Sequence, residues 1–353
     1  MTVADLLGGE HGELREAVHE ATRGVTEKYG RKYWLECARE DRFPDDMWQA
    51  MVDQGLLGLG VPEEYGGSGG GLLGVVAAME AMSTAGVPLA LYLLTAFARE
   101  AILRHGSDDQ KKRFITPVSE GKERMCFAIT EPNAGTNSFK METLATKTKN
   151  GSYIINGQKL FISAADAADK MMVVLRTTKA SEVLDRRSGL SVMVVDTKSP
   201  GLEMQKQDIG IVMPDHQYII YFNDVEVAEE NLIGAEGMGV RYMFDALNPE
   251  RMLVSAWAIG LGDFALSKAV DYANERAIFD KPIGSYQALQ HPLARSRAQL
   301  DAAIQTHGGY AFSDEYDVAT IWPVVRLLRI APVNNEMVLN YIGEHVLGLP
   351  RSY

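Results

Sequence analysis

The sequence predicts an α+β multidomain protein: an all-α N-terminal domain, a central β-barrel or sandwich domain, and a C-terminal α-helical bundle. Apolar residues recur at helical spacing in the first and last regions, whereas β-branched and alternating runs fill the middle. A strand-rich block between two helical blocks is typical of a β-domain set inside an α protein. We expect domains at residues 1–122, 123–235 and 236–353.

Local start signals support the helices of the first region. Pro44 is followed by two acids, and both Pro and negative charge suit the first turn of a helix. Ser107 precedes Asp108 and Asp109 as a helix N-cap. The expected helices are residues 11–29, one from Pro44, 73–83, 89–103 and one from Ser107 to about Thr116.

The middle region changes to strand-like periodicity. Residues 153–163 resemble two strands joined by a tight turn at Asn156-Gly157, because Asn-Gly is a favoured hairpin turn. Further strands are expected at residues 171–176, 190–196 and 218–227.

The last region returns to helical spacing. Asn248 and Pro249 predict a helix start, with Asn as N-cap and Pro in the first position. The pattern continues to Arg276 without another Pro, which corresponds to a helix of about 40 Å.

Composition limits the class of protein. The 353 residues carry a net charge of −12, which disfavours a nucleic-acid binder. Two cysteines indicate neither a disulfide framework nor a cysteine-based metal site, and we expect no metal. The start shows no secretory signal, and the longest mostly apolar run, residues 87–98, is too short to span a bilayer. We therefore expect a cytoplasmic protein that does not bind a membrane.

Residues 127–137 are the most informative segment. An apolar, strand-like run is broken by Pro132 and Gly135, and hydroxyl groups and backbone N–H groups are exposed at the break. Glycine lets the backbone approach a ligand closely, so the break suits a planar cofactor or an anion. An isolated Pro-x-x-Gly would be an ordinary turn.

Together with segments further along, this motif resembles the acyl-CoA dehydrogenase family over essentially the whole chain. The matching segments are residues 127–137, 157–163, 248–251, 276–287, 305–309 and the run from Arg329. The resemblance implies FAD as cofactor and an acyl-CoA thioester as substrate.

The resemblance also implies roles for single residues. It places Phe127, Ile129, Thr130, Thr136, Phe161 and Ser163 beside the flavin, with Thr136 also near the thioester. Fixed donors there would stabilise the negative charge of a reduced flavin. Arg276, Phe279 and Gln287 would grip the FAD of a neighbouring subunit, and Gln305, Gly308, Gly309, Asn334 and Glu336 complete the implied cofactor set.

Three positions depart from the family pattern. Thr136-Asn137 stands where Ser-Asp is usual, so a hydroxyl is kept and a carboxylate is lost. Phe161 stands where Trp is frequent and keeps only the stacking surface. Asp280 stands where Gly is normal and could place a carboxylate near the pyrophosphate.

The catalytic base is the open question of the sequence. Many family members place a Glu where this chain has Pro332, which cannot serve. A minority place this Glu directly before an Arg on the long helix, which makes Glu250 the best candidate for the base. The same resemblance implies that Arg251 helps to bind the acyl-CoA. The alternative for Glu250 is an acid that merely stabilises a helix start. Glu336 is a weaker candidate.

A further departure lies between about residues 297 and 301, where the family carries another long helix. Either the protein lacks this helix or the printed sequence omits it. We favour omission, because a bundle without one core helix would expose a large apolar face.

The sequence thus predicts an FAD-dependent acyl-CoA dehydrogenase of fatty acid metabolism that introduces an α,β double bond. An electron-transferring flavoprotein is the expected acceptor, and a homotetramer built as a dimer of dimers is the expected assembly. Alternatives are an oxidase or monooxygenase of the same fold, or a non-catalytic acyl-CoA-binding relative. Acyl chain length and branching do not follow from the sequence; Tyr92 and Phe97 are possible pocket residues or plain core aromatics.

Overall fold

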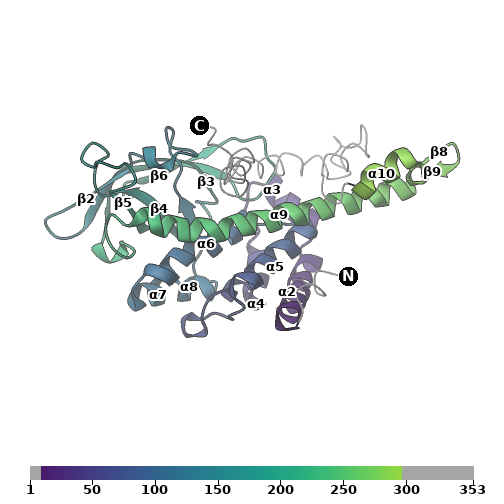
Figure 1. The fold of residues 1–353 in the computed structure, drawn as a ribbon, viewed down its shortest axis with the longest axis horizontal. Helices are drawn as coiled ribbons and strands as arrows, with labels where there is room; N and C mark the ends of the chain where they lie inside the picture. The colour runs from purple at the N-terminus through teal and green to yellow at the C-terminus, as the bar shows by residue number, and fades with distance from the viewer. Residues whose placement is uncertain (1–8, 296–353) are drawn as a thin grey trace, which may run out of the picture.

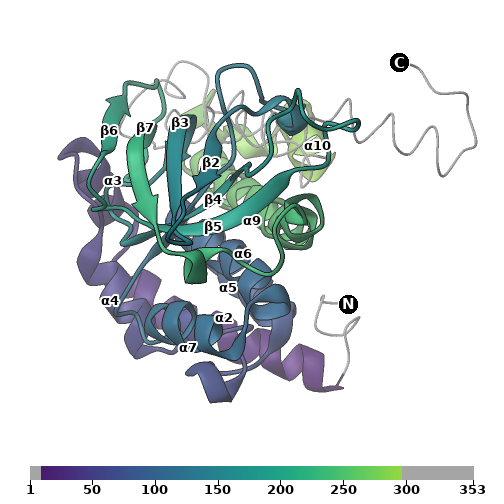
Figure 2. The same cartoon turned by 90° about the vertical axis from the view of Figure 1, so that its left-hand side faces the viewer.

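The computed structural model describes residues 9–295, and one long helix organises them (Figure 1). Helix α9 (Gly239–Glu275) runs from the β-sheet at one end to a small hairpin at the other. The N-terminal helices pack below it, and the end-on view in Figure 2 shows the curled sheet above them. The predicted α+β class, with an N-terminal helical domain, a central sheet and a C-terminal helical region, is confirmed.

The N-terminal helices form where local signals predict them. Ser107 and Gln110 form a complete capping box, in which the Ser107 Oγ accepts from the Gln110 N–H and the Gln110 Oε1 accepts from the Ser107 N–H. Helix α3 was not predicted. The helices are α2 (Gly9–Lys28), α3 (Arg31–Arg39), α4 (Asp45–Asp53), α5 (Gly71–Thr84), α6 (Ala90–His105), α7 (Asp108–Phe114) and α8 (Thr116–Ser119).

The central region is one seven-stranded sheet in the order β1-β4-β2-β3-β7-β6, with β5 paired to β4. The strands are β1 (Met125–Ala128), β2 (Leu144–Lys147), β3 (Tyr153–Ser163), β4 (Lys170–Arg176), β5 (Leu190–Asp196), β6 (Leu202–Gln207) and β7 (Gln217–Val227).

The expected hairpin at Asn156-Gly157 is wrong, because β3 continues through it. The antiparallel β3–β7 register shifts between Ile155 and Gly157, so the pair sits at an irregularity of one strand. Gly157 has φ 147°, and a Cβ there would come within 2.7 Å of the Thr143 Cα. Pairing with β7 on both sides of the irregularity outweighs the local turn signal.

The expected helix start at Asn248-Pro249 is also wrong. Helix α9 begins at Gly239, and Pro249 is buried inside it. The added N-terminal turns are held by α6, because the His105 ring stacks on Tyr242 at 4.1 Å between centroids and the His105 Nε2 lies 2.7 Å from the Asp245 Oδ2. Tertiary contacts therefore outweigh the cost of proline within a helix.

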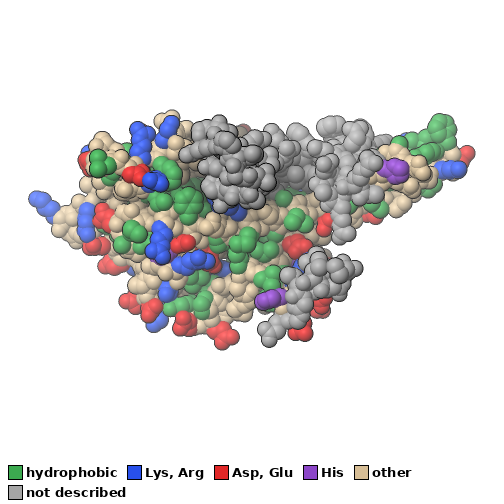
Figure 3. All heavy atoms as spheres, viewed as in Figure 1, with side chains coloured by type: hydrophobic (Ala, Val, Ile, Leu, Met, Phe, Trp, Pro, Cys, Tyr) green, Lys and Arg blue, Asp and Glu red, His purple; other side chains and the backbone are tan. Residues whose placement is uncertain are grey.

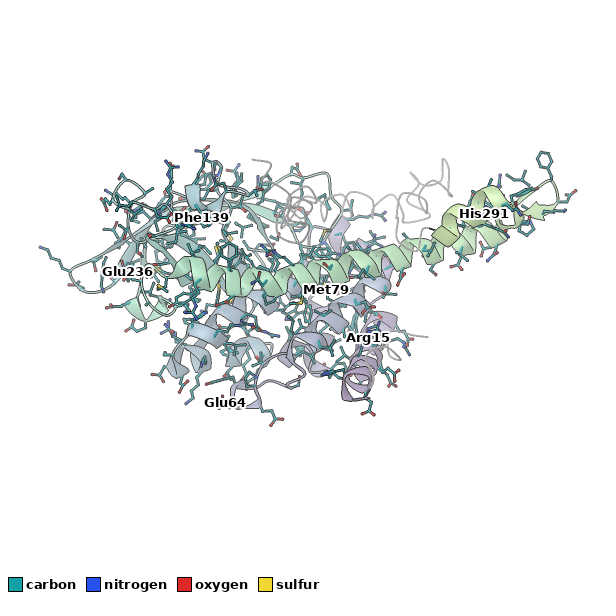
Figure 4. All side chains as sticks on the ribbon, viewed as in Figure 1. Arg15, Glu64, Met79, Phe139, Glu236 and His291 are labelled. Carbon is teal, nitrogen blue, oxygen red and sulfur yellow. The ribbon has the colours of Figure 1, made fainter. Side chains whose placement is uncertain are left out.

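Helix α9 is long enough, at about 55 Å, to connect both ends of the molecule. Its length and apolar composition would also allow it to cross a membrane. Core helices of soluble proteins share these properties, and α9 packs closely on α5: a Cβ at Gly260 would lie 2.5 Å from the Ser83 Cβ and 2.6 Å from the Glu80 carbonyl oxygen. Figure 4 shows Met79 of α5 beneath α9.

A two-stranded hairpin follows α9. Strands β8 (Ala277–Ile278) and β9 (Lys281–Pro282) are joined by Phe279 and Asp280, with φ 51° and 60°. Two positive φ angles characterise the turn that matches the twist of a tight hairpin. Helix α10 (Gln287–Arg295) comes next. Figure 3 shows apolar side chains at this protruding tip, where Phe279 is 88% exposed.

Candidate active site

A bulge at the end of β3 turns Phe161 outward. The β3–β7 register shifts between Lys159 and Ile162, and Phe161 has φ 56°. A bulky residue rarely adopts this left-handed conformation. Phe161 is 54% exposed although it belongs to a strand, so its ring offers an open aromatic surface.

Three contacts hold the bulge, from β6, from β7 and from His216 directly before β7. The Gln207 Oε1 accepts the Phe161 N–H at 3.0 Å, and the His216 carbonyl accepts the Ala164 N–H at 2.7 Å. The Gln217 Nε2 donates to the Ser163 Oγ at 2.6 Å. Neither Gln207 nor Gln217 was predicted, because their roles depend on the register between strands.

The informative segment at residues 127–137 lies beside this bulge. The Thr130 carbonyl accepts the Leu160 N–H at 2.8 Å, which joins the end of β1 to β3. Ile129 and Thr130 are half-buried, and Thr136 is exposed further along. Phe127 is buried and packs edge-on against Phe97, with centroids 4.9 Å apart. Four of the predicted flavin-contacting residues, Ile129, Thr130, Phe161 and Ser163, are therefore brought together, while the Phe127 side chain belongs to the core.

Phe97 and Tyr92 are core aromatics, which is one of the two alternatives that the sequence left open for them. Both are buried, and the Tyr92 hydroxyl donates to the Leu56 carbonyl at 3.3 Å.

Glu250 lies three turns inside α9 rather than at its start, so its expected alternative role as a helix-start acid is wrong. Its Oε2 is buried and has no hydrogen-bond partner among residues 9–295. Burial raises the pKa of Glu250 to about 8, and the charge of Arg251 opposes this only in part. A buried carboxyl group without a partner in a protein interior indicates a functional position.

Arg251 does not share the environment of Glu250. It is exposed, and its Nη1 donates to the Asn248 Oδ1 at 3.0 Å. Successive helical residues point about 100° apart, so the two side chains leave α9 in different directions.

The residues expected to grip the FAD of a neighbouring subunit lie at the hairpin end of α9 (Figure 1). Arg276 is the C-cap of α9, Phe279 is at the hairpin tip, and Gln287 begins α10. In Figure 4, Glu236 near the sheet and His291 of α10 mark opposite ends of the molecule. The sheet that contains β3, and with it Phe161, lies toward the other end of α9 (Figure 1). The remaining predicted positions, Gln305, Gly308, Gly309, Asn334 and Glu336, lie outside the described residues.

Sequence comparison decides the family. Residues 10–122, 126–225 and 237–303 match the N-terminal, middle and C-terminal domains of acyl-CoA dehydrogenases. The chain is 36% identical over 384 residues to the acyl-CoA dehydrogenase FadE12 of Mycobacterium tuberculosis, covering 97% of this chain and 98% of that protein. The chain belongs to the acyl-CoA dehydrogenase family.

Solved structures share the fold of this chain. Butyryl-CoA dehydrogenase from Megasphaera elsdenii superimposes with a TM-score of 0.87 at 27% identity, covering 95% of this chain and 98% of that one. The prolyl acyl carrier protein oxidase AnaB has a TM-score of 0.86 at 19% identity, covering 97% and 100% of the two chains, and shows the shared fold alone.

Acyl-CoA dehydrogenases use FAD, and the described residues fit a flavin. The Phe161 ring is exposed on a strained bulge. The half-buried Thr130 and Ser163 lie beside it, on two segments that the Leu160–Thr130 hydrogen bond joins. Aromatic stacking surface and hydroxyl groups are what a flat, polar-edged ring system requires. Within residues 9–295, His, Cys, Asp and Glu side chains form no group of three that could hold a metal ion.

Proposed function

We propose that this acyl-CoA dehydrogenase desaturates an acyl-CoA thioester between its α- and β-carbons, with Glu250 as the base that removes the α-proton. The observation that supports this role is the buried Glu250 Oε2, which has no partner in the part of the chain that the structure describes. A pKa raised to about 8 suits a base that must take a proton near neutral pH and release it afterwards.

Different residues remove the proton and orient the cofactor. Glu250 accepts the α-proton at its Oε2, which is buried although the residue as a whole is half-buried. Phe161, Thr130 and Ser163 orient the flavin ring. Bound FAD supplies the acceptor for the hydride that leaves the β-carbon.

The test compares Glu250→Gln with the wild type in anaerobic titrations against a panel of acyl-CoAs, following flavin absorbance. The wild type should bleach with one chain class, whereas Glu250→Gln should bind FAD normally and bleach at least about 10³-fold more slowly. The matched control is Asp271→Asn, which removes an exposed carboxylate from the same helix and should react like the wild type. Wild-type bleaching by Glu250→Gln would exclude it as the base.

The electron acceptor and the assembly form part of the proposal. An electron-transferring flavoprotein is the proposed acceptor, since the general reaction leaves a reduced flavin that must be reoxidised. Arg276 lies at the hairpin end of α9 and Phe161 in the sheet toward its other end, which supports a second copy that brings its hairpin to this flavin, within a homotetramer. Sedimentation equilibrium should give four chains; a monomer that retains FAD would contradict the assembly.

An oxidase is the second candidate, because Pro332 stands where many family members have their base. Rapid reoxidation of the reduced flavin by oxygen would favour it, and slow reoxidation would favour the dehydrogenase. Binding of acyl-CoA without any bleaching would instead indicate a non-catalytic relative.

A further inference from the structure

A buried ion pair lies behind the segment that orients the flavin. Lys159 has no exposed side-chain surface and Glu131 has 6%, and the Lys159 Nζ lies 2.8 Å from the Glu131 Oε1. Lys159 is the residue before Leu160, whose N–H bonds the Thr130 carbonyl. The pair therefore connects the two segments that carry Thr130 and Phe161.

Glu131 is held by more than its lysine. Its Oε2 accepts the Glu142 N–H at 2.6 Å, and its Oε1 accepts the Thr143 N–H at 3.1 Å. Burial by itself would raise the pKa of Glu131, but Lys159 and these donors outweigh burial and lower it. Burial lowers the pKa of Lys159, and the charge of Glu131 opposes this effect. The geometry of the two side chains, 2.8 Å apart, is that of an ion pair.

Lys159 makes a second contact, and this contact points toward the cofactor. Its Nζ donates to the Ile129 carbonyl at 3.0 Å. The Ile129 carbonyl and the Thr130 N–H belong to one planar trans peptide, in which C=O and N–H point in opposite directions. A lysine that fixes the carbonyl on the interior side therefore directs the Thr130 N–H to the other side.

The Thr130 N–H has no acceptor among the described residues, whereas the Thr130 carbonyl is bonded to Leu160. A cation on one end of a peptide also polarises it, and hydrogen bonds in a chain strengthen one another in a medium of low dielectric constant. The N–H opposite Lys159 should therefore be a stronger donor than an ordinary amide.

We propose that Lys159, held in place by Glu131, is a positioning residue that orients and polarises the Ile129–Thr130 peptide toward the flavin. Its positive charge would favour the reduced, anionic cofactor over the oxidised one. The proposal rests on the assignment of Thr130 to the flavin site and does not require Glu250 to be the base.

The experiment measures the reduction potential of protein-bound FAD with a chemical reductant and indicator dyes. Lys159→Gln/Glu131→Gln removes both charges and keeps amide groups that can still bond each other and the Ile129 carbonyl. We expect reduced FAD to lose about tenfold more affinity than oxidised FAD, which lowers the potential by about 30 mV for a two-electron couple.

The single variant Lys159→Gln leaves the Glu131 carboxylate near the same peptide. The reduction potential of FAD bound to this variant should therefore be lower than that of FAD bound to the double variant. The reduction potential of bound FAD should therefore be highest in the wild type, lower in the double variant and lowest in the single variant. This order follows the charge beside the Ile129–Thr130 peptide, whereas a purely structural role predicts no such order. If a variant folds without retaining FAD, titration of its apoprotein with oxidised and with reduced FAD gives the same ratio of affinities.

Arg99→Gln is the matched control. Arg99 is also a buried cation bonded to backbone carbonyls, those of Leu57 and Leu59 in the N-terminal domain. The Arg99→Gln variant should lower the free energy of unfolding and leave the reduction potential of bound FAD unchanged. Equal potentials in the wild type and both Lys159 variants, or an equal fall in Arg99→Gln, would overturn the proposal. Because no acyl-CoA is used, a failure of the base assignment would not alter this result.

Discussion

The backbone N–H of Leu160 donates a 2.8 Å hydrogen bond to the carbonyl of Thr130 and so joins two segments thirty residues apart. Thr130 follows the end of β1, and Leu160 immediately precedes the bulge at Phe161. This bond places a hydroxyl residue and an open aromatic ring side by side. The proposed flavin site therefore lies where a turn meets an irregular, strained strand.

Phe161→Gly should raise the stability of the apoprotein and weaken its binding of FAD. Glycine adopts φ 56° freely, so the apoprotein should gain about 1 kcal/mol in free energy of unfolding. The loss of the aromatic surface should weaken FAD binding at least tenfold. Urea unfolding of the apoprotein and FAD titration measure the two effects. A stability that falls together with FAD affinity would show that the bulge is not strained.

Glu250 should make the protein less stable as the pH rises. Its folded-state pKa of about 8 lies above the value of an unfolded chain, so the folded state binds the extra proton between these two values. Relative to Glu250→Gln, the wild type should lose up to about 1.4 kcal/mol per pH unit between roughly pH 5 and 8. Denaturant unfolding of both proteins over this range is the measurement. Parallel curves would mean that the carboxyl is solvated.

Asp215 links the β-domain to α6, because its carboxylate accepts the Ala90 and Leu91 N–H groups at 3.0 and 2.9 Å. Asp215→Ala leaves two buried donors without an acceptor and should cost about 1–3 kcal/mol in free energy of unfolding. Asp215→Asn keeps one acceptor oxygen and should cost less.

The pH dependence of Asp215 adds a second check. Burial raises its pKa to about 6, so its contribution to stability is fully present below about pH 4 and declines as the pH rises through 6. The difference between the wild type and Asp215→Asn should shift in favour of Asn over this range. A constant difference would contradict the raised pKa.

Asp280→Gly should strengthen the hairpin at the far end of α9. Asp280 has φ 60° in the second position of the turn, where glycine is favoured, so the change should stabilise the protein by roughly 0.5–1 kcal/mol. It also removes a negative charge from the segment expected to hold the FAD pyrophosphate, so FAD should bind more tightly. Calorimetry and FAD titration test both parts, and Asp280→Asn, which removes only the charge, separates them.

The sequence by itself determined the family, the helical–β–helical order and the helices with strong local signals. Ser107 with Gln110, and Pro44 with its two acids, act within one helical turn, so a short window of residues contains the whole interaction. The resemblance to the family likewise implied roles for Thr130, Phe161 and Glu250 without any knowledge of their surroundings.

Only the tertiary structure decided where α9 begins, that β3 is one strand, and what surrounds Glu250. Pro249 and Asn156-Gly157 carry local signals for a helix start and a turn, yet contacts with α6 and pairing with β7 outweigh them. The Lys159–Glu131 pair and the raised pKa of Glu250 arise in the same way. Burial and pairing depend on segments that meet only after folding, so no local pattern of residues encodes them.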